Sequence, residues 1–125
     1  MWRNISRMKR NFPDDYNIAP LTYLLPDDYS RFMYELEENK KALWILKPSA
    51  SSCGRGIRII HRNSTIPKRG SNVISRYVAN PHLLHGLKYD LRIYVLVTCF
   101  DPLRIYVYDE GLVRLATEKY TGSRK

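Results

Sequence analysis

The stretch from Lys88 to Val97, KYDLRIYVLV, constrains the fold of this chain most because it carries the clearest strand signal in it. β-Branched and aromatic residues fill it, and these residue types favour strands. Successive side chains of a strand point to opposite faces. One face is therefore apolar and is expected in a core: Leu91, Ile93, Val95 and Val97. The other face is charged at one end: Lys88, Asp90 and Arg92.

That charged face has two interpretations. A cation, an anion and a cation on one rigid element can form a polar site for a charged, hydrogen-bonding ligand. A solvated outer face of a sheet has the same composition and is the commoner case. The strongly apolar opposite face and a glycine-containing loop upstream favour the ligand site.

Four segments are predicted to build a mostly antiparallel sheet: 42–47, 57–61, 72–78 and 88–117. The first, ALWILK, is nearly all apolar and is expected to be buried on both faces. Turn signals at Asp101-Pro102 and at Asp109-Glu110-Gly111 divide the last segment into an antiparallel meander of three strands. On the third of these strands Arg114 shares an apolar face, either as an edge-strand residue or as a functional cation.

One main helix is predicted over residues 28–39, so the expected fold class is α+β. Acidic residues at its start suit the positive end of the helix dipole. Its apolar residues recur at helical spacing and form the expected buried stripe: Tyr29, Phe32, Met33 and Leu36. Residues 1–12 also show a short helical spacing, whereas 11–25 read as loop with short extended pieces and 61–71 as exposed loop.

Composition limits the function classes. The 125 residues suffice for one small domain, and the net charge of +9 favours an acidic partner. Two cysteines fit a reduced, cytosolic setting better than a disulfide framework. No apolar run is long enough to span a membrane, and the first residues lack the apolar region of a secretory signal. No aromatic RNA-binding signature is present, so nucleic acid is not the expected partner.

Residues 49–56, SASSCGRG, join the first two strands and follow Lys47 and Pro48. Small residues and two glycines let backbone N–H groups approach a phosphate closely, and hydroxyl groups add donors. The segment is not a Walker A loop, because no Gly-Lys-Ser/Thr follows and a strand comes next. A flexible hairpin connection explains this loop as well as a phosphate-binding loop does.

Several blocks together resemble the tubulin-tyrosine-ligase-like proteins. They are Trp44–Pro48 with Ser51–Ile57, Lys88–Val97 and Gly111–Arg114, and the spacing between them also fits. The resemblance runs from about Trp2 to Tyr120, and Ile66–Arg69 is most similar to the polyglutamylase branch. It implies an ATP-grasp fold and an ATP-dependent ligase that activates a protein carboxylate as an acyl phosphate, which the amine of free L-glutamate then attacks.

The resemblance also implies roles for individual residues. Lys47 would contact ATP phosphate, and Cys53 and Gly54 would lie in the loop that covers the nucleotide. The hinge whose backbone meets adenine would be Ser75, Arg76, Tyr77 and Val78, with Ser75 in place of the usual glutamine. Three more residues would contact the adenine and ribose of ATP: Lys88, Tyr89 and Asp90. Arg92 would face phosphate and Arg114 the incoming glutamate, which makes these two the candidate catalytic residues.

In the family, the Mg²⁺-binding acids and an asparagine lie beyond the residues matched here, and a substrate-binding lysine lies before Trp2. The chain therefore resembles the central part of a catalytic domain, without the C-terminal metal-binding part, and no metal ligand is expected among residues 1–125. The partners implied are the acidic C-terminal tails of tubulin in microtubules. The expected location is the cytoplasm, at microtubules and at the basal bodies of cilia.

Two other functions stay open. The chain could be a non-catalytic basic module that binds acidic tubulin tails through its charge of +9, or a structural remnant with no function of its own. Binding of ATP would separate the ligase from both. The salt dependence of tubulin or RNA binding would test the basic module.

Overall fold

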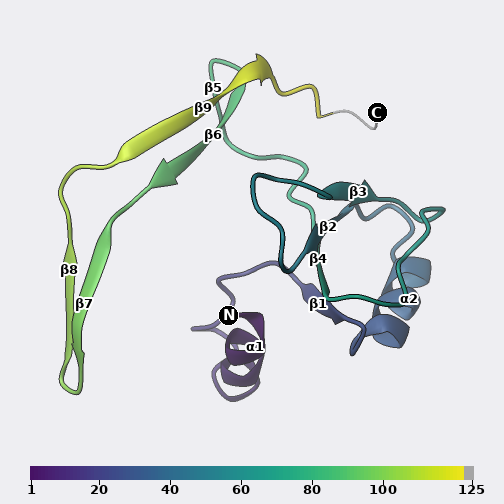
Figure 1. The fold of residues 1–125 in the computed structure, drawn as a ribbon, viewed down its shortest axis with the longest axis horizontal. Coiled ribbons are helices and arrows are strands. Elements are labelled where there is room, and N and C mark those ends of the chain that lie inside the picture. Colours follow the sequence, from purple (N-terminus) through teal and green to yellow (C-terminus); the bar gives the residue numbers. More distant parts are fainter. Residues whose placement is uncertain (123–125) are drawn as a thin grey trace. The chain divides into compact units, whose positions relative to one another are not determined.

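The computed structural model describes residues 1–122. The chain divides between Val78 and Ala79 into two compact units. Figure 1 shows helices in the first unit and strands in both. The α+β class and the mostly antiparallel pairing are confirmed. The expectation of one main helix is incomplete, because α1 (Trp2–Asn11) and α2 (Tyr29–Glu38) each have ten residues.

The first unit contains a four-stranded antiparallel sheet with the order β1-β4-β2-β3. Its strands are β1 (Thr22–Leu25), β2 (Trp44–Pro48), β3 (Arg58–Ile60) and β4 (Asn72–Arg76). Three of them agree with the predicted segments within a few residues. β1 lies in the segment 11–25, which was predicted as loop with short extended pieces and not as a strand of the sheet; Pro20 and Pro26 flank it closely. An edge strand tolerates such neighbours, since one side of it needs no hydrogen-bond partner.

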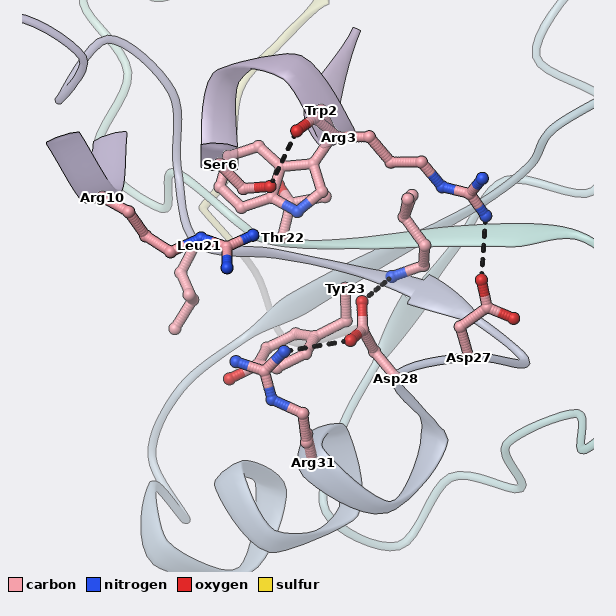
Figure 2. A pocket seen from close by; sticks show the side chains of 11 residues that line it. Trp2, Arg3, Ser6, Arg10, Leu21, Thr22, Tyr23, Asp27, Asp28 and Arg31 are labelled. Atoms are coloured by element: carbon pink, nitrogen blue, oxygen red, sulfur yellow. Dashed lines mark hydrogen bonds and ion pairs between the residues drawn. The ribbon is translucent and has the colours of Figure 1, made fainter. Parts of the chain in front are cut away.

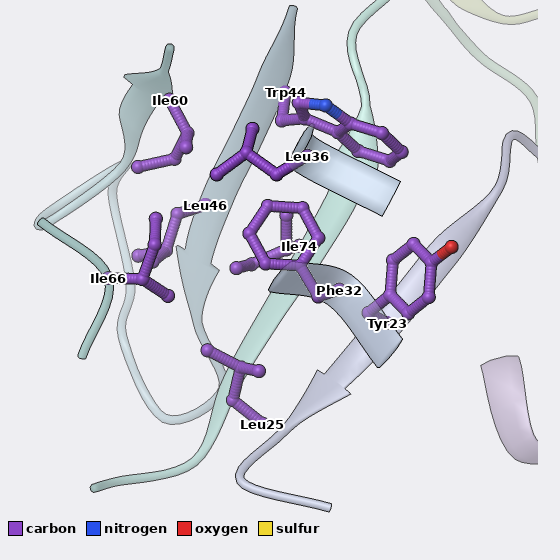
Figure 3. Close-up of a cluster of buried hydrophobic side chains, with 9 residues drawn as sticks. All are labelled: Tyr23, Leu25, Phe32, Leu36, Trp44, Leu46, Ile60, Ile66 and Ile74. Atoms are coloured by element: carbon purple, nitrogen blue, oxygen red, sulfur yellow. The ribbon is translucent and has the colours of Figure 1, made fainter. Parts of the chain in front are cut away.

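A single hydrophobic core lies on one face of this sheet, beneath α2 (Figure 3). The predicted helix stripe is confirmed, with Phe32 and Leu36 fully buried and Tyr29 and Met33 packed against the core. The remaining core residues come from the strands and one loop: Tyr23, Leu25, Trp44, Leu46, Ile60, Ile66 and Ile74.

Two burial predictions for this unit are wrong. β2 is not buried on both faces, because α2 covers only one of them; Trp44 and Leu46 are buried whereas Lys47 is exposed. The segment 61–71 is not entirely an exposed loop either. Its Ile66 is only 7% exposed, because this side chain joins the core between the ends of the strands.

Replacing Phe32 by alanine is expected to lower the free energy of unfolding of the first unit by about 3–5 kcal/mol. The Phe32 ring packs against two aromatic rings, with centroid distances of 5.5 Å to Tyr23 and 5.3 Å to Trp44. Denaturant unfolding of the chain measures the change. Tyr34→Ala, on the exposed side of the same helix, is the control and should lose far less. Equal losses in the two variants would contradict this placement of α2.

The second unit is a long two-stranded hairpin rather than the predicted meander. Its outgoing side consists of β6 (Leu87–Arg92) and β7 (Val95–Phe100), and its returning side of β8 (Leu103–Val107) and β9 (Leu112–Lys119). β7 pairs with β8 and β6 with β9, while the short β5 (Leu83–Leu84) pairs with β6. Figure 1 shows both sides of the hairpin in green and yellow.

The predicted strand 88–97 is therefore interrupted after Arg92, and the turn expected at Asp109-Glu110-Gly111 is not a hairpin turn. Gly111 instead lies directly opposite the break. A Cβ atom at this position would be 2.6 Å from the carbonyl oxygen of Arg92. Glycine thus permits a close backbone approach where the sequence pattern indicated a reversal of the chain.

The apolar face expected in a core is exposed. Leu91, Ile93 and Val95 are between 55% and 60% exposed, and no residue of 79–122 is buried. A two-stranded hairpin offers no second layer against which these side chains could pack. Within residues 79–122 no second layer covers this face.

Candidate functional site

In the first unit, Lys47 and Ser75 lie on the sheet face opposite α2. Lys47 pairs in register with Val73, and Ile45 with Ser75, so these side chains share a face. Lys47 is exposed there, and the Ser75 hydroxyl is 2.9 Å from the hydroxyl of Thr22. The structure thus places an exposed cation and the start of the predicted hinge on adjacent strands of one face.

The loop predicted to cover a nucleotide is an exposed turn with left-handed backbone. Cys53 has φ +55° and Gly54 φ +75°. The loop is tied to the next connection by Ser49, whose N–H donates to the carbonyl of Ser71 at 3.0 Å. Left-handed residues allow successive N–H groups to line a concave surface, which suits an anion. Open space surrounds the position of a Cβ at Gly54, so a ligand can approach it.

The predicted hinge coincides with the border between the two units, which falls after Val78. Two of its backbone donors are already used within the first unit. The N–H of Arg76 donates to the carbonyl of Leu21, and that of Tyr77 to the carbonyl of Leu43, both at 2.8 Å. Hydrogen bonds from the hinge to a ligand would therefore come from its carbonyl groups or from Val78.

In the second unit, Asp90 and Arg114 form a cross-strand ion pair. They are register partners on β6 and β9. The guanidinium Nε of Arg114 donates to both carboxylate oxygens of Asp90 at 3.2 and 3.0 Å, and Nη2 donates to Oδ2 at 2.6 Å. This pair explains why an arginine lies on an otherwise apolar strand face. The pairing of Asp90 with Arg114 was not predicted from the sequence, because the two residues are 24 positions apart and the strand order was predicted wrongly.

The hydrogen bonds from Arg114 hold the pKa of the Asp90 carboxyl below its ordinary value, and the nearby charge of Arg92 lowers this pKa further. Because the pKa is lower in the folded chain, the stabilisation is complete above about pH 4 and is lost as the pH falls through the folded-state pKa. Carboxyl-carbon NMR should show Asp90 titrating below its ordinary pKa, and Arg114→Ala should raise that pKa. An unchanged Asp90 titration in Arg114→Ala would contradict the pair.

Three further predicted residues lie beside this pair. The Lys88 ammonium is 5.4 Å from the centroid of the Tyr120 ring, and the Tyr89 hydroxyl is 3.0 Å from Nδ1 of His82. Arg92 is exposed on the same strand, opposite Leu112. An open depression of about 410 Å³ is lined by four of the residues named for ATP or glutamate and by two apolar ones: Lys88, Tyr89, Asp90, Arg114, Leu115 and Ala116. The partners His82 and Tyr120 carried no signal in the sequence.

The structure therefore groups the predicted residues into two sets, one in each unit. Lys47, the 49–56 loop and the hinge belong to the first, and Lys88 to Arg92 with Arg114 belong to the second. Both sets offer exposed cations and hydrogen-bonding groups that suit phosphates. Their joint binding of one nucleotide stays a prediction.

Residues 1–122 do not offer a fitting Mg²⁺ site. No group of three or more His, Cys, Asp or Glu that could hold a metal ion occurs within that range. Asp90, the acid nearest the predicted site, is already bound by Arg114. No chemical step is therefore assigned to a metal on these residues. In the same range, no helix is long and apolar enough to cross a membrane.

Comparison with known proteins identifies the family to which this chain belongs. The model of the tubulin-tyrosine ligase family matches residues 1–125, and the chain belongs to this family. It is 44% identical over 126 residues to the tubulin monoglutamylase TTLL4 of Mus musculus, which covers 100% of this chain and 11% of that protein. It is 44% identical to a probable beta-tubulin polyglutamylase of Tetrahymena thermophila, over 94% of this chain and 10% of that protein.

A third relative is the tubulin polyglutamylase TTLL7 of Mus musculus, 39% identical over 94% of this chain and 13% of that protein. The resemblance to the polyglutamylase branch is thereby confirmed. The chain spans no more than about a seventh of the length of these relatives.

Proposed function

We propose that residues 1–125 are the central part of an ATP-grasp-like catalytic domain of a glutamate ligase that acts on tubulin. The ligase would use ATP to convert a carboxylate of the acidic tubulin tail into an acyl phosphate, and the amine of free L-glutamate would attack it. The observation that carries this proposal is the family match over the whole chain, with 39–44% identity to glutamylases. The place of action would be cytoplasmic microtubules, including those of ciliary basal bodies.

The residues of the first unit would hold the phosphates and the base of ATP. Lys47 would bind a phosphate as an exposed point charge at the end of β2. The turn containing Cys53 and Gly54 would close over the nucleotide with its backbone donors. The hinge from Ser75 to Val78 would bind adenine through backbone groups, so the serine at position 75 is tolerated.

The residues of the second unit would bind the ribose side and stabilise charge. Lys88, Tyr89 and Asp90 would contact adenine and ribose, and Arg92 would face the phosphate on which negative charge develops. Arg114 would bind the carboxylate of the incoming glutamate. ATP supplies the phosphoryl group that makes the acceptor carboxylate reactive, and the arginines stabilise the charges that this transfer creates.

The alternative function is a basic module that binds acidic tubulin tails without catalysis. The net charge of +9 favours it. Such a module would bind tubulin with a steep salt dependence and would show no saturable binding of ATP.

Calorimetry with ATP and the purified chain tests the ligase proposal. Saturable binding is expected, and Lys47→Ala should weaken it roughly tenfold or more, since it removes a charge-assisted contact. Lys40→Ala, an exposed lysine of the same unit outside the proposed site, is the control and should bind as the wild type does. Absence of ATP binding, or equal binding by Lys47→Ala and Lys40→Ala, would contradict the proposal.

A further inference from the structure

A cleft of about 430 Å³ lies within the first unit, between α1 and the segment that contains β1 and the start of α2 (Figure 2). None of the residues assigned to ATP or glutamate lines it. α1 contributes Trp2, Arg3, Ser6 and Arg10, and no residue of this helix is buried. The opposite wall consists of Leu21–Leu24, Asp27, Asp28 and Arg31.

Three arginines line this cleft, and two of them already bind carboxylates. Nη2 of Arg3 donates to Asp27 at 2.8 Å, and Nη1 of Arg31 donates to Asp28 at 3.1 Å. Arg10 has no ion pair within residues 1–122, and Figure 2 shows its guanidinium group directed into the cleft. Within residues 1–122 the cleft thus contains one guanidinium without an ion pair, that of Arg10, and one whose partner Asp27 is an exposed carboxylate. The Asp28 carboxylate that binds Arg31 is half-buried and also accepts a hydrogen bond from the N–H of Leu24.

The cleft also has an aromatic residue on each wall. Trp2 and Tyr23 belong to its lining, so the aliphatic part of a bound side chain would find apolar contacts beside the arginines. α1 adds Arg7 and Lys9 and carries no acidic residue, so the cleft borders a basic helix. Alternating apolar contacts and guanidinium groups suit glutamate side chains, which combine an aliphatic stem with a carboxylate.

We propose that this cleft binds an acidic peptide segment of the protein acceptor, at a position separate from the nucleotide-binding residues. The inference rests on the proposed function, because that function supplies an acidic acceptor. A nucleic acid fits less well, since its closely spaced phosphates would meet the carboxylates of Asp27 and Asp28 in the same cleft. A peptide can place separate carboxylates at Arg10 and between the existing ion pairs.

Asp27 would act as an internal competitor of the acceptor. Its carboxylate is exposed and occupies Arg3, whose side chain is exposed as well. An exposed pair of this kind is weak, so an incoming carboxylate can displace it. Removing the charge of Asp27 should therefore release Arg3 and strengthen peptide binding, whereas removing Arg10 should weaken it.

The test is titration of the purified chain with a hexaglutamate peptide, followed by calorimetry and by tryptophan fluorescence. Trp44 is fully buried, so a change in emission reports on Trp2 in the cleft. Arg10→Ala should bind the peptide roughly tenfold more weakly. Asp27→Asn should bind it about two- to fivefold more tightly. Arg69→Ala, an exposed arginine outside the cleft, removes the same charge and should bind as the wild type does.

Two further ligands test whether binding requires carboxylates and whether the cleft prefers a peptide to a nucleic acid. A hexaglutamine peptide should not bind, and a hexauridylate should bind more weakly than hexaglutamate. Three results would overturn the proposal. The first is that hexaglutamate does not bind, and the second is that Arg10→Ala and Arg69→Ala bind it equally. The third is that hexauridylate binds as tightly as hexaglutamate and depends on Arg10. ATP titrated in parallel separates the two claims: ATP binding without peptide binding refutes the cleft alone, and peptide binding without ATP binding refutes the ligase alone.

Discussion

Arg92→Ala is expected to lower kcat for glutamate ligation roughly a hundredfold or more, as the loss of one donor to a developing anion typically does. The enzyme for this test is a chimera in which residues 1–125 replace the matching segment of the mouse tubulin monoglutamylase TTLL4. Arg92 is exposed on β6 next to the Asp90–Arg114 pair, which already uses the guanidinium of Arg114. Arg92 is thus the arginine of this strand face with no ion pair within residues 1–122.

Arg104→Ala is the matched control for that measurement. Arg104 lies on β8 of the same unit, is exposed and is outside the proposed site. Its loss should leave kcat close to that of the unmodified chimera. Wild-type turnover in Arg92→Ala, or equal losses in the two variants, would remove Arg92 from the mechanism.

The second large effect is a complete absence of activity in the 125-residue chain by itself. Purified chain with ATP, Mg²⁺, radiolabelled glutamate and microtubules should incorporate no label above a control without enzyme. Transfer of a γ-phosphoryl group calls for a metal that bridges phosphate oxygens. The acids of the second unit do not form a site for one: Asp90 is bound by Arg114, Asp101, Asp109 and Glu110 lie outside the strands, and Glu118 on β9 belongs to no group of three or more metal-binding residues within residues 1–122.

A positive result in that assay would be informative as well. ATP-dependent incorporation by the chain alone would mean that residues 1–125 contain a metal site that the described residues do not reveal. The prediction that the chain alone has no activity would then be wrong.

The elements that depend on local patterns were predictable from the sequence. The spacing of Phe32 and Leu36 defined both α2 and its buried face, and the apolar run around Trp44 and Leu46 defined β2. These patterns act within one or two turns of a helix or along one strand, so a single sequence contains them. β1 was predicted only as a short extended piece within a loop, because a four-residue strand between prolines carries little local signal.

The strand order of the second unit could not be predicted in the same way. Asp109-Glu110-Gly111 has the composition of a hairpin turn, yet Gly111 serves a close approach to the backbone of Arg92. That approach depends on pairing between residues far apart in the chain. The wrong order concealed the contact between Asp90 and Arg114, which only the correct register brings together.

The candidate site was predicted by resemblance more than by pattern. Residue types alone left the Lys88–Arg92 face and the 49–56 loop open to ordinary interpretations. The family match confirms the resemblance, and Lys47 and Arg92 are exposed in the structure, but the roles of these residues and of the hinge stay predictions. The cleft beside α1 was not predicted, because its arginines and acids come from three elements whose packing the sequence does not show.

The most direct test of the account is ATP-dependent incorporation of glutamate into microtubules by the chimera with TTLL4. We expect incorporation with ATP, none without it, and a loss of roughly a hundredfold or more in Arg92→Ala. A chimera that is monodisperse, unfolds at the temperature of unmodified TTLL4 and incorporates no glutamate would contradict the claim that residues 1–125 are a working part of a glutamate ligase.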